Sequence, residues 1–252
     1  MANLFNEILY RPLLNLLFLA YNHTLPDIGV AIVVVTIFIR LVLLPLFYKS
    51  AKDQTIIQKI APRIKEIQQT HKNDKERQVK EMMAVYKEHK VNPFSSFLLL
   101  FIQLPILFAL YRVFLGGFSD AILKELYPFV AAPAHINFSF LGIIPLDQKN
   151  IVLVILAALF QYAQSALLLR VSKKARATSP ATPPAKGDMA AMTEKLSRRM
   201  MLFTPVLTAV ILLPLPSAVA LYWLTTSAFS TVQQVIINKR IREHDERHQT
   251  GQ

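Results

Sequence analysis

The sequence contains no cysteine at all. Disulfide bonds, thiol catalysis, cysteine-ligated metal sites and lipoprotein modification of an N-terminal cysteine are therefore excluded. Acidic residues are also missing from every long apolar run of the chain. An ion pair between two side chains inside those runs is thereby excluded as well.

Glycine is scarce, with six residues, and none of them lies in a phosphate-binding pattern. The Gly-x-Ser-x-Gly motif of serine hydrolases is absent too. His244 and His248 are four residues apart, but a zinc-protease helix needs a glutamate directly after its first histidine, and Asp245 stands there. We therefore expect no enzyme, no cofactor and no metal site.

Hydrophobic residues are abundant: they make up 53% of the chain, charged residues only 17%, and mean hydropathy is +0.37. A helix needs about 20 apolar residues to cross a bilayer. The composition therefore predicts an all-α polytopic membrane protein with five transmembrane helices. The expected parts are an N-terminal interfacial amphipathic helix (1–27), transmembrane helices at 28–48, 93–115, 151–170, 200–215 and 217–237, a cytoplasmic helical hairpin (49–92), an external loop (116–150), a cytoplasmic basic and Pro-rich loop (171–199), and a short, polar, irregular basic cytoplasmic tail (238–252).

Lysine and arginine are unevenly distributed among the connecting segments, and short cytoplasmic loops attract them. Segments 49–92 and 170–199 and the tail after Asn238 hold 11, 8 and 4 of the 28, whereas 116–150 holds only two. The N-terminus is therefore expected outside and the C-terminus in the cytoplasm. Without a cleavable signal or transit-peptide pattern at the N-terminus, we expect a bacterial plasma membrane protein. The net charge of +12 would attract anionic lipids or, less specifically, RNA.

Two segments outside the expected spans carry helical patterns. Glu7, Arg11 and Asn15 fall on one face of an apolar stretch, which indicates an amphipathic helix in the outer interface. In 49–92, two apolar stripes at helical spacing predict two helices that pack antiparallel, with Asn73 or Asp74 capping the second. Pro62 is expected to kink the first arm. The stripes consist of Ile57, Ile60, Ile64 and Ile67, and of Val79, Met82 or Met83, and Tyr86.

Arg40 lies within the first apolar run, far from either end. Such a charge costs from about 3 to more than about 10 kcal/mol in a membrane, so it tends to mark function. Lys49 marks the cytoplasmic interface nine residues later, so Arg40 lies roughly 13 Å deeper, beyond easy snorkelling reach. Water, a backbone carbonyl, polar side chains of neighbouring helices or an acidic partner from outside must solvate it.

Polar residues recur in the other apolar runs, including Gln103 in the second and a dense series in the fifth. Each could simply form a hydrogen bond between helices, worth about 0.6 kcal/mol on average. Together with Arg40, and with Thr36 one helical turn before it, they predict a hydrated cavity within the membrane that opens to the cytoplasm. The residues in the fifth run are Tyr222, Thr225, Thr226, Ser230, Gln233 and Gln234.

Four blocks of sequence then resemble one known family. They read TIFIRLVLLPL at 36–46, EMMAVYKEHKVNPF at 81–94, LLLFIQLPILFALYRV at 98–113 and ALYWLTTSAFSTVQQVIINK at 220–239. In order and spacing these blocks are similar to the YidC/Oxa1/Alb3 membrane protein insertases, and most similar to the bacterial YidC branch. The large external domain of Gram-negative members has no counterpart here, and Trp223 stands where tyrosine is common.

The resemblance implies five helices around a hydrophilic groove that opens to the cytoplasm and to lipid. Such a groove captures the hydrophilic segment of a nascent membrane protein, and the hydrophobic segment then passes along the second and fifth spans into lipid, without nucleotide hydrolysis. The implied partners are nascent membrane proteins and, at the hairpin and tail, the ribosome, the Sec translocon or the signal-recognition-particle receptor. The expected substrate-binding groove comprises Arg40, Thr36, Gln103, Tyr222, Trp223, Thr226 and Ser230.

Two other classes of function were weighed against an insertase. A channel or small-solute transporter lined by Arg40 and the fifth span would predict inverted repeats with broken helices, and the sequence has no such repeat. An intramembrane hydrolase would need a nucleophile and a base that can be paired, and none can be placed.

Overall fold

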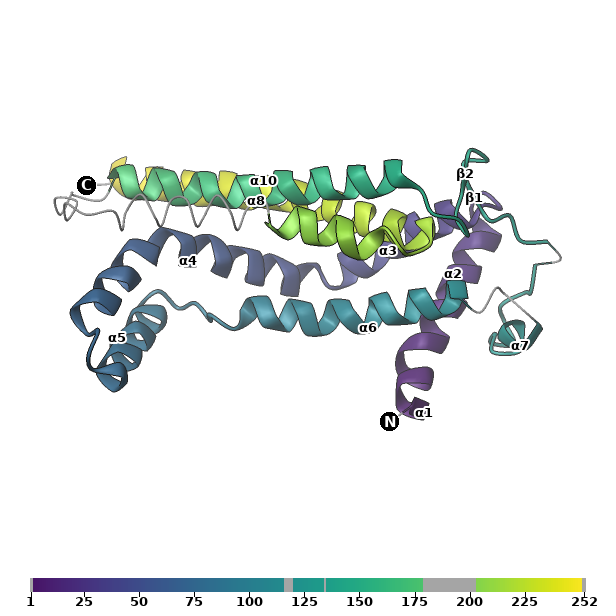
Figure 1. Cartoon of the computed structure of the whole chain (residues 1–252), viewed down its shortest axis with the longest axis horizontal. Helices are drawn as coiled ribbons and strands as arrows, with labels where there is room; N and C mark the ends of the chain where they lie inside the picture. Colours follow the sequence, from purple (N-terminus) through teal and green to yellow (C-terminus); the bar gives the residue numbers. More distant parts are fainter. Residues whose placement is uncertain (1, 116–119, 134, 179–202, 251–252) are drawn as a thin grey trace. The chain divides into compact units, whose positions relative to one another are not determined.

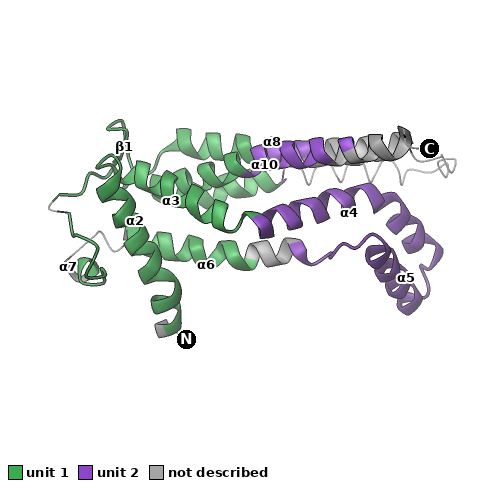
Figure 2. Ribbon diagram, turned by 180° about the vertical axis from the view of Figure 1, so that it is seen from behind, with its two compact units in different colours: residues 1–44, 100–161, 204–229 green, residues 45–99, 162–203, 230–252 purple. Residues whose placement is uncertain are grey.

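The computed structural model describes residues 2–115, 120–133, 135–178 and 203–250, and nearly all of its regular structure is helical (Figure 1). The chain divides into two compact units, which Figure 2 shows in different colours. The first unit comprises residues 1–44, 100–161 and 204–229, and the second comprises 45–99, 162–203 and 230–252. The long helices α6 (Ser95–Leu115), α8 (Ile151–Thr178) and α10 (Ser217–Thr250) contribute residues to both units.

The N-terminal part of the first unit is a series of short helices. α1 (Ala2–Phe5) leads into one π-helical turn, η1 (Asn6–Tyr10), and then into α2 (Arg11–His23). α3 (Ile28–Val42) follows, and the carboxylate of Asp27 caps it by accepting a hydrogen bond from the Val30 amide at 2.9 Å. Helical structure is therefore present where we expected an amphipathic helix, and its apolar side chains pack into the core of the first unit. Its location in the outer interface stays a prediction.

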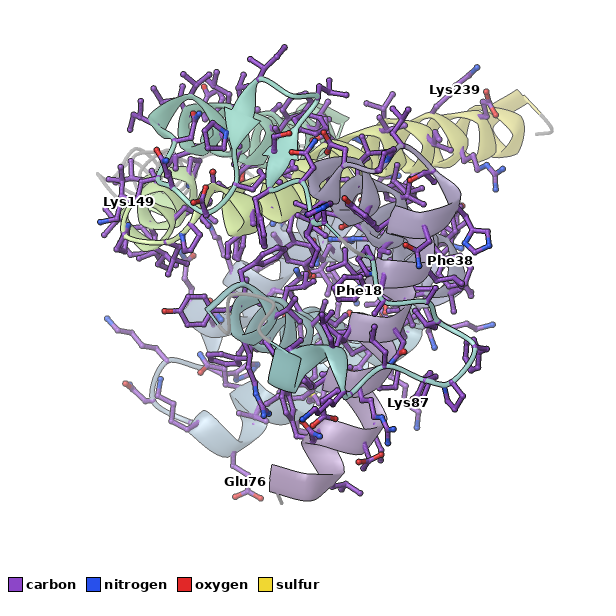
Figure 3. The ribbon with its side chains drawn as sticks, turned by 90° about the vertical axis from the view of Figure 1, so that its right-hand side faces the viewer. Phe18, Phe38, Glu76, Lys87, Lys149 and Lys239 are labelled. Carbon is purple, nitrogen blue, oxygen red and sulfur yellow. The ribbon has the colours of Figure 1, made fainter. Side chains whose placement is uncertain are left out.

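The core of the first unit is one apolar cluster. It brings together buried side chains of α2, α3, α6, α8 and α10. Phe18 of α2 is fully buried there, whereas Phe38 of α3 is 52% exposed (Figure 3). Because α2 contributes Leu14, Leu17 and Phe18 with no exposed area, the N-terminal helix is an integral part of this core.

The expected span 28–48 is divided in the structure. α3 ends at Val42 and α4 (Leu44–Thr70) begins two residues later. Pro45 has no amide hydrogen and cannot donate to the carbonyl of Leu41, which accounts for a break at this place. Pro62 does not interrupt the helix assignment of α4.

Length and hydropathy decide which of the described helices could cross a membrane. No single helix among them combines the length and the hydropathy that a membrane span requires. The segments Asn6–His23 and Ile28–Val42 meet both criteria as a pair, bent by 120° at their junction. Shorter apolar helices occur at Phe101–Phe114, Ile151–Leu167 and Phe203–Leu212. The five spans and their orientation stay predictions.

Two of the expected irregular segments are helical. α8 continues to Thr178, so the first part of the expected Pro-rich loop 171–199 is helical; the rest of this loop lies outside the described residues. α10 continues to Thr250 through the tail that we expected to be irregular. No glycine or proline occurs between residues 218 and 250, and Lys239 pairs with Glu243 one turn later at 3.9 Å.

The segment 116–150, which we expected to be an external loop, contains structure that the sequence did not indicate. α7 (Asp120–Leu123) is followed by β1 (Ser139–Phe140) and β2 (Ile144–Pro145), which pair antiparallel, with Phe140 opposite Ile144. Leu141 and Gly142 form the turn between the strands, both with positive φ angles of 56° and 69°.

The second unit contains the expected helical hairpin, formed by α4 and α5 (Lys75–Glu88). Asp74 caps α5 by accepting a hydrogen bond from the Arg77 amide at 2.9 Å. Ile60 and Ile64 of α4 are buried with Val85 and Val91, which confirms the stripe on the first arm. The stripe on the second arm includes Met82 and Tyr86 as expected, but Val79 was wrong, because it is 58% exposed. It consists of Met82, Val85 and Tyr86, and burial raises the pKa of the Tyr86 hydroxyl.

Candidate functional site

Arg40 lies in the last turn of α3 and is buried, with 7% of its area exposed. The carbonyl end of a helix carries partial negative charge, so a cation in the last turn is favoured. Thr36 is one turn earlier and is also buried. Its hydroxyl donates to the Ile32 carbonyl at 2.6 Å, so its hydrogen-bonding capacity as a donor is used within the helix.

Tyr222 of α10 is the side chain at which three helices meet. It is 3% exposed, and its hydroxyl accepts a hydrogen bond from the Gln103 amide group of α6. The Arg40 guanidinium of α3 lies within electrostatic range of the same tyrosine. The structure thus brings together Arg40, Gln103 and Tyr222, three of the residues expected in the groove, from segments far apart in the sequence.

The remaining expected groove residues of α10 are placed differently. Trp223 is half-buried and packs against the apolar core of the first unit. Thr226 is buried close to Tyr222, but its hydroxyl oxygen has no partner with hydrogen-bond geometry among the described residues. Ser230 belongs to the second unit, so its membership of the groove stays a prediction.

A further polar pair lies one turn beyond Tyr222 in sequence. Ser227 of α10 donates to the side-chain carbonyl of Gln161 in α8 at 3.2 Å. Both residues belong to the first unit. This pair corresponds to the simple interhelical hydrogen bond that we considered for every polar residue of the apolar runs.

Residues 137–148 contact the beginnings of the two helices that carry Arg40 and Tyr222. At α3, the Ile28 amide donates to the Asn137 carbonyl at 3.2 Å. At α10, the Ser217 and Ala218 amides donate to the carbonyls of Gln148 and Leu146 at 2.8 and 3.1 Å. The first amides of a helix have no hydrogen-bond partner within the helix. Here, backbone carbonyls of residues 137–148 accept hydrogen bonds from them. We call these residues the outer clamp.

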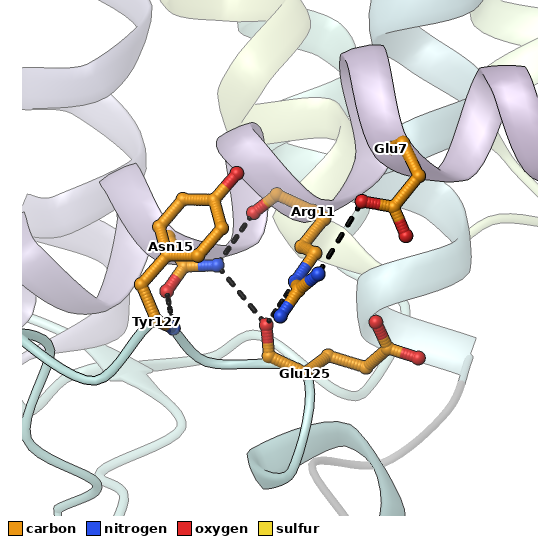
Figure 4. Close-up of polar contacts among 5 residues, drawn as sticks. All are labelled: Glu7, Arg11, Asn15, Glu125 and Tyr127. Carbon is orange, nitrogen blue, oxygen red and sulfur yellow. Dashed lines mark hydrogen bonds and ion pairs between the residues drawn. The ribbon is translucent and has the colours of Figure 1, made fainter.

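The polar face of the N-terminal helices binds the loop that follows α7 (Figure 4). Arg11 and Asn15 both donate to the carbonyl of Glu125, at 3.1 and 3.2 Å, and Arg11 also pairs with Glu7 at 3.3 Å. The Asn15 side chain accepts a hydrogen bond from the Tyr127 amide at 2.6 Å. The stripe of Glu7, Arg11 and Asn15 that the sequence shows is therefore an anchoring surface within the first unit.

Arg40 lines neither of two sizeable cavities in the described part of the chain. One measures 460 Å³ and lies in the hairpin beside Arg63, Glu81 and Glu88. The other measures 430 Å³ and is formed by α3, α6 and the N-terminal helices. The cytoplasm-open groove around Arg40 stays a prediction. Within the described residues, no group of three or more histidine, aspartate or glutamate side chains could hold a metal ion.

Comparison with known proteins identifies the family. Residues 19–245 match the family described as 60Kd inner membrane protein. The chain belongs to this family, the YidC/Oxa1/Alb3 family. The chain is 34% identical to the membrane protein insertase YidC of Clostridium tetani, covering 86% of this chain and 84% of that protein. Membrane protein insertase YidC of Clostridium perfringens is 32% identical, with 86% and 83% covered.

Family membership indicates the bacterial inner membrane as the location of this chain. A third YidC relative, from Pelagibacter ubique, is 30% identical over 86% of this chain, but this match covers only 36% of that longer protein. The matched segment includes Arg40, Gln103 and Tyr222. It begins after η1 and most of α2, so the anchoring surface of Glu7, Arg11 and Asn15 lies outside it.

Proposed function

We propose that this chain is a membrane protein insertase and chaperone. It captures the hydrophilic segment of a nascent membrane protein at Arg40 and releases the hydrophobic segment into the bilayer without nucleotide hydrolysis. The names of the YidC relatives support the activity. The observation that carries the mechanism is the buried Arg40 guanidinium within electrostatic range of Tyr222, which in turn accepts a hydrogen bond from Gln103, on three helices of one unit.

The physical reason for capture is the burial of the charge. Coulomb attraction at a given distance grows as the effective dielectric constant falls, so a buried arginine attracts an acidic segment more strongly than an exposed one. The surrounding Gln103 and Tyr222 groups are polar and can also accommodate an uncharged hydrophilic segment. We therefore expect Arg40 to matter most for substrates whose outer segment is acidic.

Release is driven by the hydrophobic segment itself. Burial of apolar area contributes about 25 cal/mol per Å², and a span of roughly 20 apolar residues buries enough area to drive its transfer to lipid. The proposed path follows α6 and α10 into the bilayer. The N-terminus is proposed to lie outside and the C-terminus in the cytoplasm, where the hairpin and the helical tail would meet the ribosome, the Sec translocon or the signal-recognition-particle receptor.

Insertion into proteoliposomes that contain only this purified chain tests the proposal. Two single-span substrates are compared, identical except that the outer tail is acidic in one and neutral in the other, and insertion is scored by protease protection. Arg40→Ala should reduce insertion of the acidic substrate by about 10- to 100-fold, the equivalent of losing one or two interactions with a charged group. Arg40→Lys should retain part of it, and the neutral substrate should depend on Arg40 less.

Three results would contradict this mechanism. Equal insertion by the wild type, Arg40→Ala and Arg40→Lys would show that the charge is not used. An equal loss for both substrates would show that Arg40 supports the fold rather than electrostatic capture. Ion leakage from the liposomes without any insertion would instead indicate a pore.

A further inference from the structure

The 430 Å³ cavity of the first unit is apolar throughout. It lies among the N-terminal helices, α3 and α6, and α10 contributes none of its lining residues. Its volume is in the range of about 300 to 1,000 Å³ that is typical of small-ligand pockets. It therefore shares α6 with the path that we propose for the substrate, but it lacks α10, the other helix of that path. Its lining includes Leu9, Leu13, Phe38, Val42, Ile102 and Pro105.

One cation is held next to this cavity. Arg112 is exposed and lies on α6 seven residues after Pro105, which is two helical turns and roughly 10 Å further along the same face. Its Nη1 donates to Asn6 Oδ1 at 3.1 Å, and its guanidinium lies 4.4 Å from the centre of the Tyr10 ring.

The same short segment contacts both the cation and the cavity. Asn6 and Tyr10, which hold Arg112, are the first and last residues of η1, and Ile8 and Leu9 between them line the cavity. A guanidinium carries five N–H donors in a planar fork that suits a phosphate, and Asn6 accepts one of them. η1 thus places a phosphate-binding group beside an apolar pocket.

We propose that this is a phospholipid site, with the lipid phosphate on Arg112 and one acyl chain in the cavity. The chain belongs to a membrane protein family, so phospholipid surrounds it. Val42 and Phe38 of the lining are 61% and 52% exposed, so an acyl chain can enter from the surface. The roughly 10 Å between Pro105 and Arg112 leaves room for the glycerol and the first carbons of the chain.

The volume argues against a helical substrate segment in the same place. A single turn of an α-helix with its side chains, about 11 Å across and 5.4 Å long, already fills roughly 500 Å³. The cavity of 430 Å³ is smaller than that turn, which favours a narrower ligand over a helix. An unbranched acyl chain is narrower and can follow an irregular apolar pocket.

Photo-labelling in nanodiscs tests the site. The full chain is reconstituted with phosphatidylglycerol that carries a photoreactive group in one acyl chain, and labelled peptides are mapped by mass spectrometry. Label should concentrate in the peptides that contain Leu9, Phe38 and Ile102. Val42→Trp should fill the entrance and remove most of that label. Val210→Trp is the matched control, because Val210 is 59% exposed on the helix Phe203–Leu212 and does not line the cavity.

A second probe tests the phosphate contact. Diacylglycerol with the same photoreactive chain lacks the phosphate. Arg112→Gln should weaken labelling by phosphatidylglycerol about tenfold, as expected for loss of a charge-assisted hydrogen bond, and leave labelling by diacylglycerol unchanged. Arg112→Lys keeps the charge and should restore part of the difference.

Each half of the proposal can fail separately. Even labelling of all exposed apolar helices, or labelling unaffected by Val42→Trp, would overturn the acyl-chain site. Equal loss of both probes in Arg112→Gln would overturn the phosphate contact. Labelling of the cavity by a photoreactive nascent segment in place of lipid would assign it to the substrate. Because none of these readouts measures insertion, failure here is distinct from failure of the proposed function.

Discussion

Gly29 in the first turn of α3 packs against Phe140 of β1, and replacing it with alanine tests the outer clamp. A Cβ atom added at Gly29 would lie 2.6 Å from the Phe140 Cβ and 2.8 Å from its Cα. Both distances are below 3.0 Å, which real Cβ atoms essentially never show. Since Cα belongs to the backbone, no change of the Phe140 rotamer can relieve the contact, and β1 must move away from α3.

Two opposing effects determine the size of the change. Alanine is better than glycine within a helix by at most about 1 kcal/mol. Overpacking of a tight contact typically costs about 1 to 3 kcal/mol. The cost of overpacking is the larger of the two because the backbone must shift. Gly29→Ala should therefore lower the free energy of unfolding by about 1 to 2 kcal/mol. For a chain of this size each 1 kcal/mol corresponds to a fall in Tm of about 2 to 4 °C.

Thermal unfolding of the full chain in nanodiscs measures this change, with the fluorescence of Trp223, the single tryptophan, as the signal. Gly142→Ala is the comparison, because a Cβ there meets nothing within 4 Å and only the φ angle of +69° opposes it. Gly142→Asn should recover most of that loss, since asparagine tolerates this conformation. At Gly29, by contrast, asparagine should recover none of the loss seen with alanine, because the contact with Phe140 opposes any Cβ atom. A Tm for Gly29→Ala equal to or above that of the wild type would refute the contact between α3 and β1.

Two further predictions concern the candidate site and the hairpin. Tyr222→Phe removes the acceptor of the Gln103 hydrogen bond but leaves Arg40 in place. Insertion of an acidic substrate should therefore fall by no more than about threefold, the equivalent of about 0.6 kcal/mol. A loss as large as that of Arg40→Ala would show that the Tyr222 hydroxyl itself takes part in capture. In the hairpin, Val85→Ala should cost about 1 to 3 kcal/mol and Val79→Ala less than about 0.5, because Val85 is 4% exposed and Val79 is 58% exposed. Hydrogen exchange of the α4 and α5 amides measures this pair, and equal effects would contradict the packing.

Local signals in the sequence were sufficient for the hairpin. The isoleucine stripe of α4 and the cap at Asp74 both follow from helical spacing and capping preference, and both are confirmed. The apolar stripe of the second arm was harder to predict. Met82 and Met83 are adjacent, and both Val79 and Val85 lie close to helical spacing from them. Only the contact with α4 selects Val85. Helix content was underestimated in α8 and α10 because polar and charged composition was taken to indicate loops, although it is equally compatible with an exposed helix.

The outer clamp could not be predicted from the sequence. Its hydrogen bonds join backbone amides of α3 and α10 to backbone carbonyls of residues 137–148, and backbone groups are the same in every residue. The strands β1 and β2 are two residues long, too short for a recognisable alternation. The contact of Gly29 with Phe140 leaves a trace in the sequence only as a glycine in a helix of β-branched residues.

The polar residues of the site were predicted, but the reason why Arg40 is tolerated was not. The sequence places Arg40 within a continuous apolar run, where a charge costs about 3 kcal/mol or more. The structure ends α3 at Val42, so Arg40 lies in the last turn, where the helix carbonyls favour a cation by about 0.3 to 2 kcal/mol. Tyr222, and through it Gln103, adds a polar surface on the other side. Of the four kinds of solvation that the sequence left open, backbone carbonyls, here those at the end of a helix, and a polar side chain of a neighbouring helix are thus near Arg40 in the fold. In the mechanism that we propose, an acidic substrate segment needs only to improve on these interactions, which is a smaller demand than neutralising a bare buried charge and is compatible with reversible capture.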